Sequence, residues 1–278
     1  LVCVNGSDEE IINNRAADQQ LLSHPEPFFD ALLALKNEGK WQLDQAWIEL
    51  NRKHRGEWAQ QTLSELEADT DKALASGGKL HPLQLSLDVQ DCLGANDWLV
   101  IDGGNTHFWS EIAANISGWK GNKLAGMMHP GAFSMLGVGV SFAIAAKNIN
   151  PQGAAVLISG DGAFLSGGLS IETAFQENLP IVVVIDNNGG LDCISQQQER
   201  LFANGGHFAT DFRDIPFHTM IAGLGGYGEL VETRDQLQPA IKRAIASGKT
   251  ACVNVKTKGV ISPIVAATAN KRENSSIE

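Results

Sequence analysis

Hydrophobic residues after position 79 fall into short continuous runs separated by longer segments with helical spacing. The runs predict five strands: Trp98–Asp102, Ala154–Ser159, Ile181–Asp186, Glu229–Glu232 and Ala251–Val255. The segments beside them predict helices near Leu83–Leu93, Phe108–Ile116, Leu136–Lys147, Leu169–Glu177, Phe217–Leu224 and Arg234–Ala246. Continuous apolar strands that alternate with helices are typical of a parallel sheet covered on both faces, so we predict a doubly wound α/β fold.

The first 78 residues have a different pattern. The opening LVCV predicts a strand, Pro25–Asn37 predicts a helix with one apolar side, and residues 41–75 predict a polar helix with a sparse apolar stripe. Gly77 and Gly78 then mark a boundary. We therefore expect the end of a preceding domain over residues 1–40, a solvated linker helix over 41–78, the α/β domain over 79–262 and a loosely held polar tail over 263–278.

Charge and cysteine spacing restrict the class of protein. A formal net charge of −11 argues against a nucleic-acid surface, which needs an excess of Lys and Arg. The chain has no run of 18 apolar residues that would span a membrane, and its first residues do not resemble a signal peptide. The four cysteines form no CxxC pair, which favours reduced thiols over structural zinc. We expect a cytoplasmic protein with neither nucleic-acid nor membrane partners.

Two of the predicted strands end in polar, glycine-rich turns. The first runs into Gly160-Asp161-Gly162 and the second into Asn187-Asn188-Gly189-Gly190. Carboxyl ends of parallel strands meet at one edge of a sheet, and glycine lets the backbone approach a phosphate closely. The Asp161 carboxylate, the Asn188 amide oxygen and a backbone carbonyl would supply three oxygen ligands to Mg²⁺. Two phosphate oxygens and a water would complete the octahedron.

A dinucleotide fingerprint is the competing interpretation of the same glycines. A G-x-G-x-x-G motif would need glycine at position 165, where Leu165 stands, although Asp186 could serve as the acidic ribose partner. This interpretation also leaves the Asn-Asn-Gly-Gly turn without a role. The sequence therefore favours the metal and phosphate site.

The GDG…NN pair resembles the signature of thiamine-diphosphate enzymes, and the wider sequence is similar to the acetolactate synthase, benzaldehyde lyase and oxalyl-CoA decarboxylase group. Asp102–Trp109 resembles the loop over the diphosphate, Ser134–Ala146 the segment that cradles the aminopyrimidine, and the first 35 residues the close of the family's middle domain. The resemblance implies thiamine diphosphate and Mg²⁺ as cofactors.

The resemblance also assigns residues by position. It implies Asp161, Asn188 and the Gly190 carbonyl as metal ligands. Leu136 falls where the family has a bulky apolar wedge, often Met, that holds the two cofactor rings in a V, and the Ser134 carbonyl would accept a hydrogen bond from the cofactor's amino group. We treat these two residues as the catalytic candidates. The implied cofactor-binding residues are Asn105, Thr106, Gly160, Asp161, Gly162, Ala163, Phe164, Asn188 and Gly190.

The chain matches only the carboxyl half of such an enzyme. In the family, a glutamate of an amino-terminal domain activates the pyrimidine, and no segment here resembles that domain. The resemblance therefore implies a partner, a pyrimidine-binding domain from a missing amino-terminal half or from another chain, in a homodimer or tetramer. The implied reaction cleaves or forms a C–C bond next to a carbonyl of a small substrate, as in 2-keto acid decarboxylation and carboligation. The alternatives are a 2-hydroxyacyl-CoA or benzoin-type lyase and a non-catalytic cofactor-binding subunit.

Three histidines stand in predicted loops near the cofactor edge: His107, His129 and His207. Each is a candidate proton relay, and each is also compatible with a surface imidazole that has no chemical role. Glu172, on a predicted helix, is interpreted as a helix-face residue rather than a base.

Overall fold

The computed structural model describes residues 1–11, 16–40, 42–75, 79–202 and 207–267, with side chains of 70–75 left aside. The chain divides into two compact units, Leu1–Arg55 and Gly56–Glu278. The predicted boundary at 76–78 lies outside the described residues. In the first unit, β1 (Val2–Asn5) pairs in parallel with β2 (Gln19–Leu22), and α1 (Pro25–Asn37) follows. The sequence predicted β1 and α1 but not β2.

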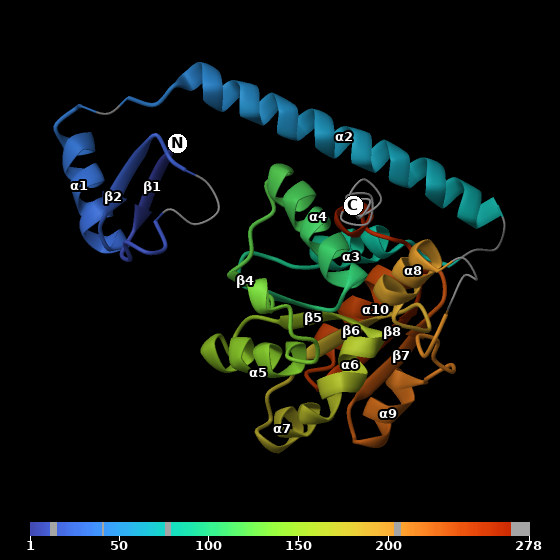
Figure 1. Ribbon diagram of the computed structural model, residues 1–278. Helices are drawn as coiled ribbons and strands as arrows, with labels where there is room; N and C mark the ends of the chain where they lie inside the picture. The colour runs from blue at the N-terminus through green and yellow to red at the C-terminus, as the bar shows by residue number, and fades with distance from the viewer. Residues whose placement is uncertain (12–15, 41, 76–78, 203–206, 268–278) are drawn as a thin grey trace. The chain divides into compact units, whose positions relative to one another are not determined.

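A six-stranded sheet is the centre of the second unit (Figure 1). Its strands lie in the order β4-β3-β5-β6-β8-β7, and every pair is parallel. The strands are β3 (Trp98–Asp102), β4 (Gly126–Met128), β5 (Ala155–Gly160), β6 (Val182–Asn187), β7 (Tyr227–Val231) and β8 (Ala251–Lys256). The prediction of a parallel α/β sheet is confirmed.

Helices cover both faces of this sheet, because successive strand residues point to opposite sides. On β5, Val156 and Ile158 enter the core beneath α3 and α10, while Leu157 enters the opposite core beneath α5, α7 and α9. The helices are α3 (Pro82–Asp91), α4 (Asn105–Trp119), α5 (Gly139–Ile149), α6 (Asp161–Gly167), α7 (Ile171–Gln176), α8 (Asp192–Leu201), α9 (Phe217–Gly223) and α10 (Arg234–Ala246). The two layers explain why apolar residues on these strands do not alternate with polar ones.

The long helix α2 (Gln45–Ala75) contains the division between the two units. In the second unit its residues Ala59 and Leu66 are buried against Leu83 and Leu87 of α3 and Trp109 of α4. The prediction of a helix solvated along its whole length is therefore wrong after Gly56. The apolar stripe is sparse because only one edge of this part packs.

The other differences lie at turns. Gly137 has φ +89°, which is incompatible with a helix, so α5 begins at Gly139 rather than at Leu136. A 3-10 turn at Gly168–Ser170 replaces the start of the helix expected over Leu169–Glu177, so α7 begins at Ile171. Residues 263–267 are helical and Val265 is buried, so this part of the expected loose tail is held. Among the described residues, no helix is both long and apolar enough to cross a bilayer.

Candidate functional site

Asp161 and Asn188 meet at the carboxyl edge of the sheet. Asp161 directly follows β5, and Asn188 directly follows the neighbouring strand β6. The Asp161 Oδ2 atom accepts hydrogen bonds from the N–H groups of Gly189 (2.8 Å) and Gly190 (3.1 Å). The Asn188 Oδ1 atom also accepts a bond from the Gly190 N–H, at 3.2 Å. The two predicted metal ligands, Asp161 and Asn188, are therefore linked to the same turn.

The shape of this turn depends on its two glycines. Gly189 has φ +90°, a conformation that residues with a Cβ rarely adopt. A Cβ on Gly190 would lie 2.6 Å from the carbonyl oxygen of Thr210, whose segment is joined to the turn by the Leu191 N–H to Thr210 carbonyl bond of 2.8 Å. Among the hydrogen bonds of the described residues, none ends on the Gly190 carbonyl. That oxygen is available as a third ligand.

Three carboxylates without a matching cation dominate the electrostatics. Burial and, to a smaller extent, the neighbouring Asp186 raise the pKa of Asp161 to about 7. Burial also raises the pKa of Asp186, which lies beneath the site, and the pKa of Asp192 to about 6. The Oδ2 atom of Asp192 is buried and has no hydrogen-bond partner among the residues that the structure describes. A dense set of buried oxygen donors of this kind favours a divalent cation.

A cavity of about 260 Å³ opens beside these residues. Ten of the predicted cofactor-binding and catalytic residues line it: Asn105, Thr106, Ser134, Leu136, Gly160, Asp161, Gly162, Ala163, Asn188 and Gly190. Phe164 is the exception, because its ring is buried against Phe217 at a centroid distance of 5.6 Å. The assignment of its backbone N–H to the diphosphate stays a prediction.

Side chains of Asn105 and Thr106 are committed to protein partners rather than pointing freely into the cavity. The Asn105 amide donates to Gln196 (2.9 Å), and its oxygen accepts from the Ser262 N–H (3.2 Å). The Thr106 hydroxyl donates to Asp186 at 2.7 Å, and Thr257 donates to the other oxygen of that carboxylate. Asp186 is thus enclosed beneath the site, which leaves no room for the ribose contact of a dinucleotide.

The loop that carries Ser134 and Leu136 is anchored from the sheet. Oδ2 of Asp102, at the end of β3, accepts bonds from the N–H groups of Gly137 (3.0 Å) and Gly139 (2.7 Å). Leu136 is 40% exposed and lines the cavity instead of packing in the core. Ser134 has φ +48° and ends a short 3-10 turn.

Several lining residues were not singled out from the sequence, among them Asp192 and Cys193. Both begin α8, a polar helix that the sequence analysis did not predict. An acidic residue two positions after the Asn-Asn-Gly-Gly turn was the available signal. Of the three histidines, His107 lines the cavity, whereas His207 lies outside the lining and bonds Glu199 and Asp211 on an exposed loop.

Comparison with known proteins identifies the family of this site. The family described as "Thiamine pyrophosphate enzyme, C-terminal TPP binding domain" matches residues 102–255, from the end of β3 through β8. The chain belongs to this family. Membership implies thiamine diphosphate, typically bound with Mg²⁺.

Curated relatives come from two groups of enzymes in this family. The acetolactate synthase large subunit IlvG of Mycobacterium tuberculosis is 34% identical over 210 residues, which cover 73% of this chain and 37% of the relative. The human 2-hydroxyacyl-CoA lyase 2 is 31% identical over 191 residues, covering 65% and 29%. The chain therefore matches only about a third of these relatives' length, 37% of the first and 29% of the second.

The residues present fit a bound Mg²⁺ and diphosphate. Asp161, Asn188 and the Gly190 carbonyl offer hard oxygen atoms, and the Asp192 oxygen without a partner adds negative charge. Among the described residues that line the cavity, none is Lys or Arg. A diphosphate there would meet uncompensated negative charge unless a cation came with it.

Proposed function

We propose that this chain binds the diphosphate of thiamine diphosphate through a divalent cation that is coordinated by Asp161, Asn188 and the Gly190 carbonyl. The observation that carries the proposal is the Asp161–Gly189–Gly190 hydrogen-bond set, which joins two strand ends into one turn of oxygen donors. Buried Asp186 holds Thr106 and Thr257 in place below. The oxygen atoms of the site are therefore held in place before an ion binds, and their negative charge favours a cation.

The chain's other residues shape the cofactor's surroundings. Gly162 and Ala163, at the start of α6, line the cavity that would receive the diphosphate, and the Gly162 N–H donates a hydrogen bond to Asp161 Oδ1 at 2.7 Å. Leu136 would support the cofactor rings from one side and exclude water from them, and the Ser134 carbonyl would accept a hydrogen bond from the cofactor's amino group. Asp102 fixes both through Gly137 and Gly139. Thiamine diphosphate, when bound, supplies the electron sink for cleavage next to a carbonyl.

We infer that the whole protein cleaves or forms a C–C bond next to a carbonyl, as an acetolactate synthase-like enzyme acting on a 2-keto acid. The similarity to IlvG supports this reaction, and the similarity to the 2-hydroxyacyl-CoA lyases supports the alternative of an acyl-CoA substrate. A pyrimidine-binding domain would complete the site, in a homodimer or tetramer. All three proposed metal ligands are present, which argues against the alternative of a non-catalytic cofactor-binding subunit.

Substrate assays on the full-length protein test the reaction. With thiamine diphosphate and Mg²⁺ present, pyruvate and a 2-hydroxyacyl-CoA are supplied separately, and products are identified by mass spectrometry. We expect CO₂ release with a carboligated product from pyruvate. Cleavage of the acyl-CoA alone would select the alternative. A protein that binds the cofactor yet turns over neither class would contradict the proposed chemistry.

A further inference from the structure

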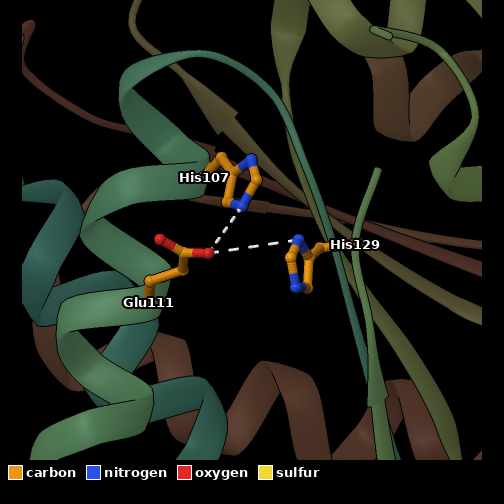
Figure 2. A group of neighbouring side chains, drawn as sticks. All are labelled: His107, Glu111 and His129. Atoms are coloured by element: carbon orange, nitrogen blue, oxygen red, sulfur yellow. Dashed lines mark hydrogen bonds and ion pairs between the residues drawn. The ribbon is translucent and has the colours of Figure 1, made fainter. Parts of the chain in front are cut away.

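A second group of possible metal ligands lies beside the cofactor site. Figure 2 shows His107 and Glu111 on one helix, both directed toward His129 on a separate segment. The His107 Nε2 atom lies 3.0 Å from Glu111 Oε1, and His129 Nδ1 lies 4.0 Å from the same oxygen. The imidazole centroids are 5.1 Å apart. One ligand atom from each residue lies within 4.8 Å of the others.

The fold dictates this convergence. His107 and Glu111 are four residues apart on α4, so they share one helix face. His129 directly follows β4, the edge strand whose Met128 pairs with Val100 of β3. Since β3 leads into α4 through Asp102–Gly104, the helix start and the end of β4 occupy the same sheet edge. Two of the ligands, His107 and Glu111, therefore lie on helix α4, and the third, His129, is the residue that follows strand β4.

Burial and chemistry suit a transition metal rather than Mg²⁺. His107 is buried, while the side chains of Glu111 and His129 are about one-third exposed (32% and 33%). Two imidazole nitrogens and one carboxylate oxygen form a ligand set that suits Zn²⁺, Co²⁺ or Ni²⁺, whereas Mg²⁺ prefers oxygen alone. His107 lines the cofactor cavity and Glu111 lines a separate cavity of about 590 Å³, so an ion has an entry path.

The two histidine–glutamate distances are near those of a tetrahedral site, and the ligand atoms of the two histidines lie within 4.8 Å of each other. Ligands of a tetrahedral zinc with bonds of about 2.0–2.1 Å lie about 3.3 Å apart. The His107–Glu111 distance of 3.0 Å already meets this requirement, and His129 must approach Glu111 by less than 1 Å from its present 4.0 Å separation (roughly 0.7 Å). Its Nδ1 atom now accepts a long, 3.2 Å bond from the Gly131 N–H, which would give way to the metal.

We propose that His107, Glu111 and His129 form a second metal site that takes a zinc-class divalent ion. It has three protein ligands and an open fourth position for water or a substrate oxygen, the arrangement of catalytic rather than structural zinc sites. The site is separate from Asp161, Asn188 and Gly190. It does not depend on the function proposed above, because none of its residues holds the diphosphate or Mg²⁺.

Zinc titration of the full-length, tag-free protein tests the site. After chelator treatment and dialysis into excess Mg²⁺, Zn²⁺ binding is measured by calorimetry, and metal content by mass spectrometry after gel filtration. We expect one zinc per chain. His129→Asn and Glu111→Gln should each weaken the affinity by about 100-fold or more, since even partners behind a ligand contribute about 10–100-fold. His24→Asn, which changes an exposed histidine of the other unit, is the matched control.

Two further arms keep the outcomes distinct. Asp161→Asn should lose cofactor binding but retain the zinc, so failure of one site does not imply failure of the other. With Co²⁺ in place of Zn²⁺, the wild type should show the visible absorption of a four-coordinate, nitrogen-bound ion, even if a variant fails to fold. Absence of zinc and of this spectrum, or equal zinc affinity in the wild type and both ligand variants, would overturn the proposal.

Discussion

At the scale of single residues, one substitution distinguishes two roles for Leu136: packing in the protein core and positioning the cofactor. It is 40% exposed, lines the cavity and is held by a loop bonded to Asp102. We expect Leu136→Ala to leave cofactor affinity nearly unchanged and to lower kcat on the order of 100-fold, because a displacement of about 1 Å at the reacting atoms costs that much. Steady-state kinetics at saturating cofactor measure this. A variant that keeps kcat but loses thermal stability would show that Leu136 is only a packing residue.

His81 should make folding stability depend on pH. It is 8% exposed, its Nδ1 accepts the Leu83 N–H at the start of α3, and burial followed by Lys258 lowers its pKa to about 4. The unfolded chain, with a pKa near 6.5, binds the proton more readily. Stability from this residue is therefore full above about pH 6.5 and falls as the pH drops toward 4, by up to about 3 kcal/mol.

Denaturant unfolding at pH 7 and pH 4.5 measures this dependence. The control is His81→Asn, which keeps an acceptor at the helix start but does not titrate. We expect the difference in unfolding free energy between the two pH values to be smaller in the variant. Identical differences in both proteins would show that His81 does not contribute.

At the scale of elements, the turn after β6 contributes two of the three proposed metal ligands, Asn188 and Gly190. We expect Gly189→Ala to lower the free energy of unfolding by about 1–2 kcal/mol, the cost of a side chain in the left-handed region. The space for a Cβ is open, so the cost is conformational. Because the Asp161 bonds depend on this turn, cofactor affinity should fall as well.

Gly248 provides a matched control for this substitution. It also has positive φ (+63°) and open space for a Cβ, but it follows α10, away from the cavity. Gly248→Ala should cost similar stability without changing cofactor affinity, as measured by unfolding and calorimetry. An equal loss of affinity in both variants would mean that general destabilisation, not the turn, is responsible.

The elements also show what the sequence could predict. Trp98–Asp102 and Arg234–Ala246 have the predicted bounds, and β5 and β6 are shifted by one residue, because long apolar runs and a capping box are strong local signals. The strand β4 is only Gly-Met-Met, and α8 is polar, so neither has such a signal. The bonds of Asn105 to Gln196 and Ser262 depend on distant segments, which no local pattern reveals.

For the whole molecule, the apolar loop beside the cavity points to the proposed pyrimidine-binding partner. Phe133 is 89% exposed and Met135 is 57% exposed, next to Ser134 and Leu136 of the cavity lining. We expect Phe133→Ser in the full-length protein to weaken assembly, measured by light scattering over a dilution series. Ile149→Ser, 65% exposed at the far end of α5, should leave assembly unchanged. If both variants keep the wild-type oligomeric state, the loop is not part of the interface.

Calorimetric titration of thiamine diphosphate tests the central claim most directly. The full-length wild type is titrated with Mg²⁺ present and again in EDTA, and Asp161→Asn is titrated with Mg²⁺. The account predicts tight binding only for the wild type with Mg²⁺, because in the other two cases the diphosphate meets the carboxylates or the turn without the bridging cation. Wild-type affinity that is unchanged in EDTA would contradict the assignment of Asp161, Asn188 and Gly190 as metal ligands.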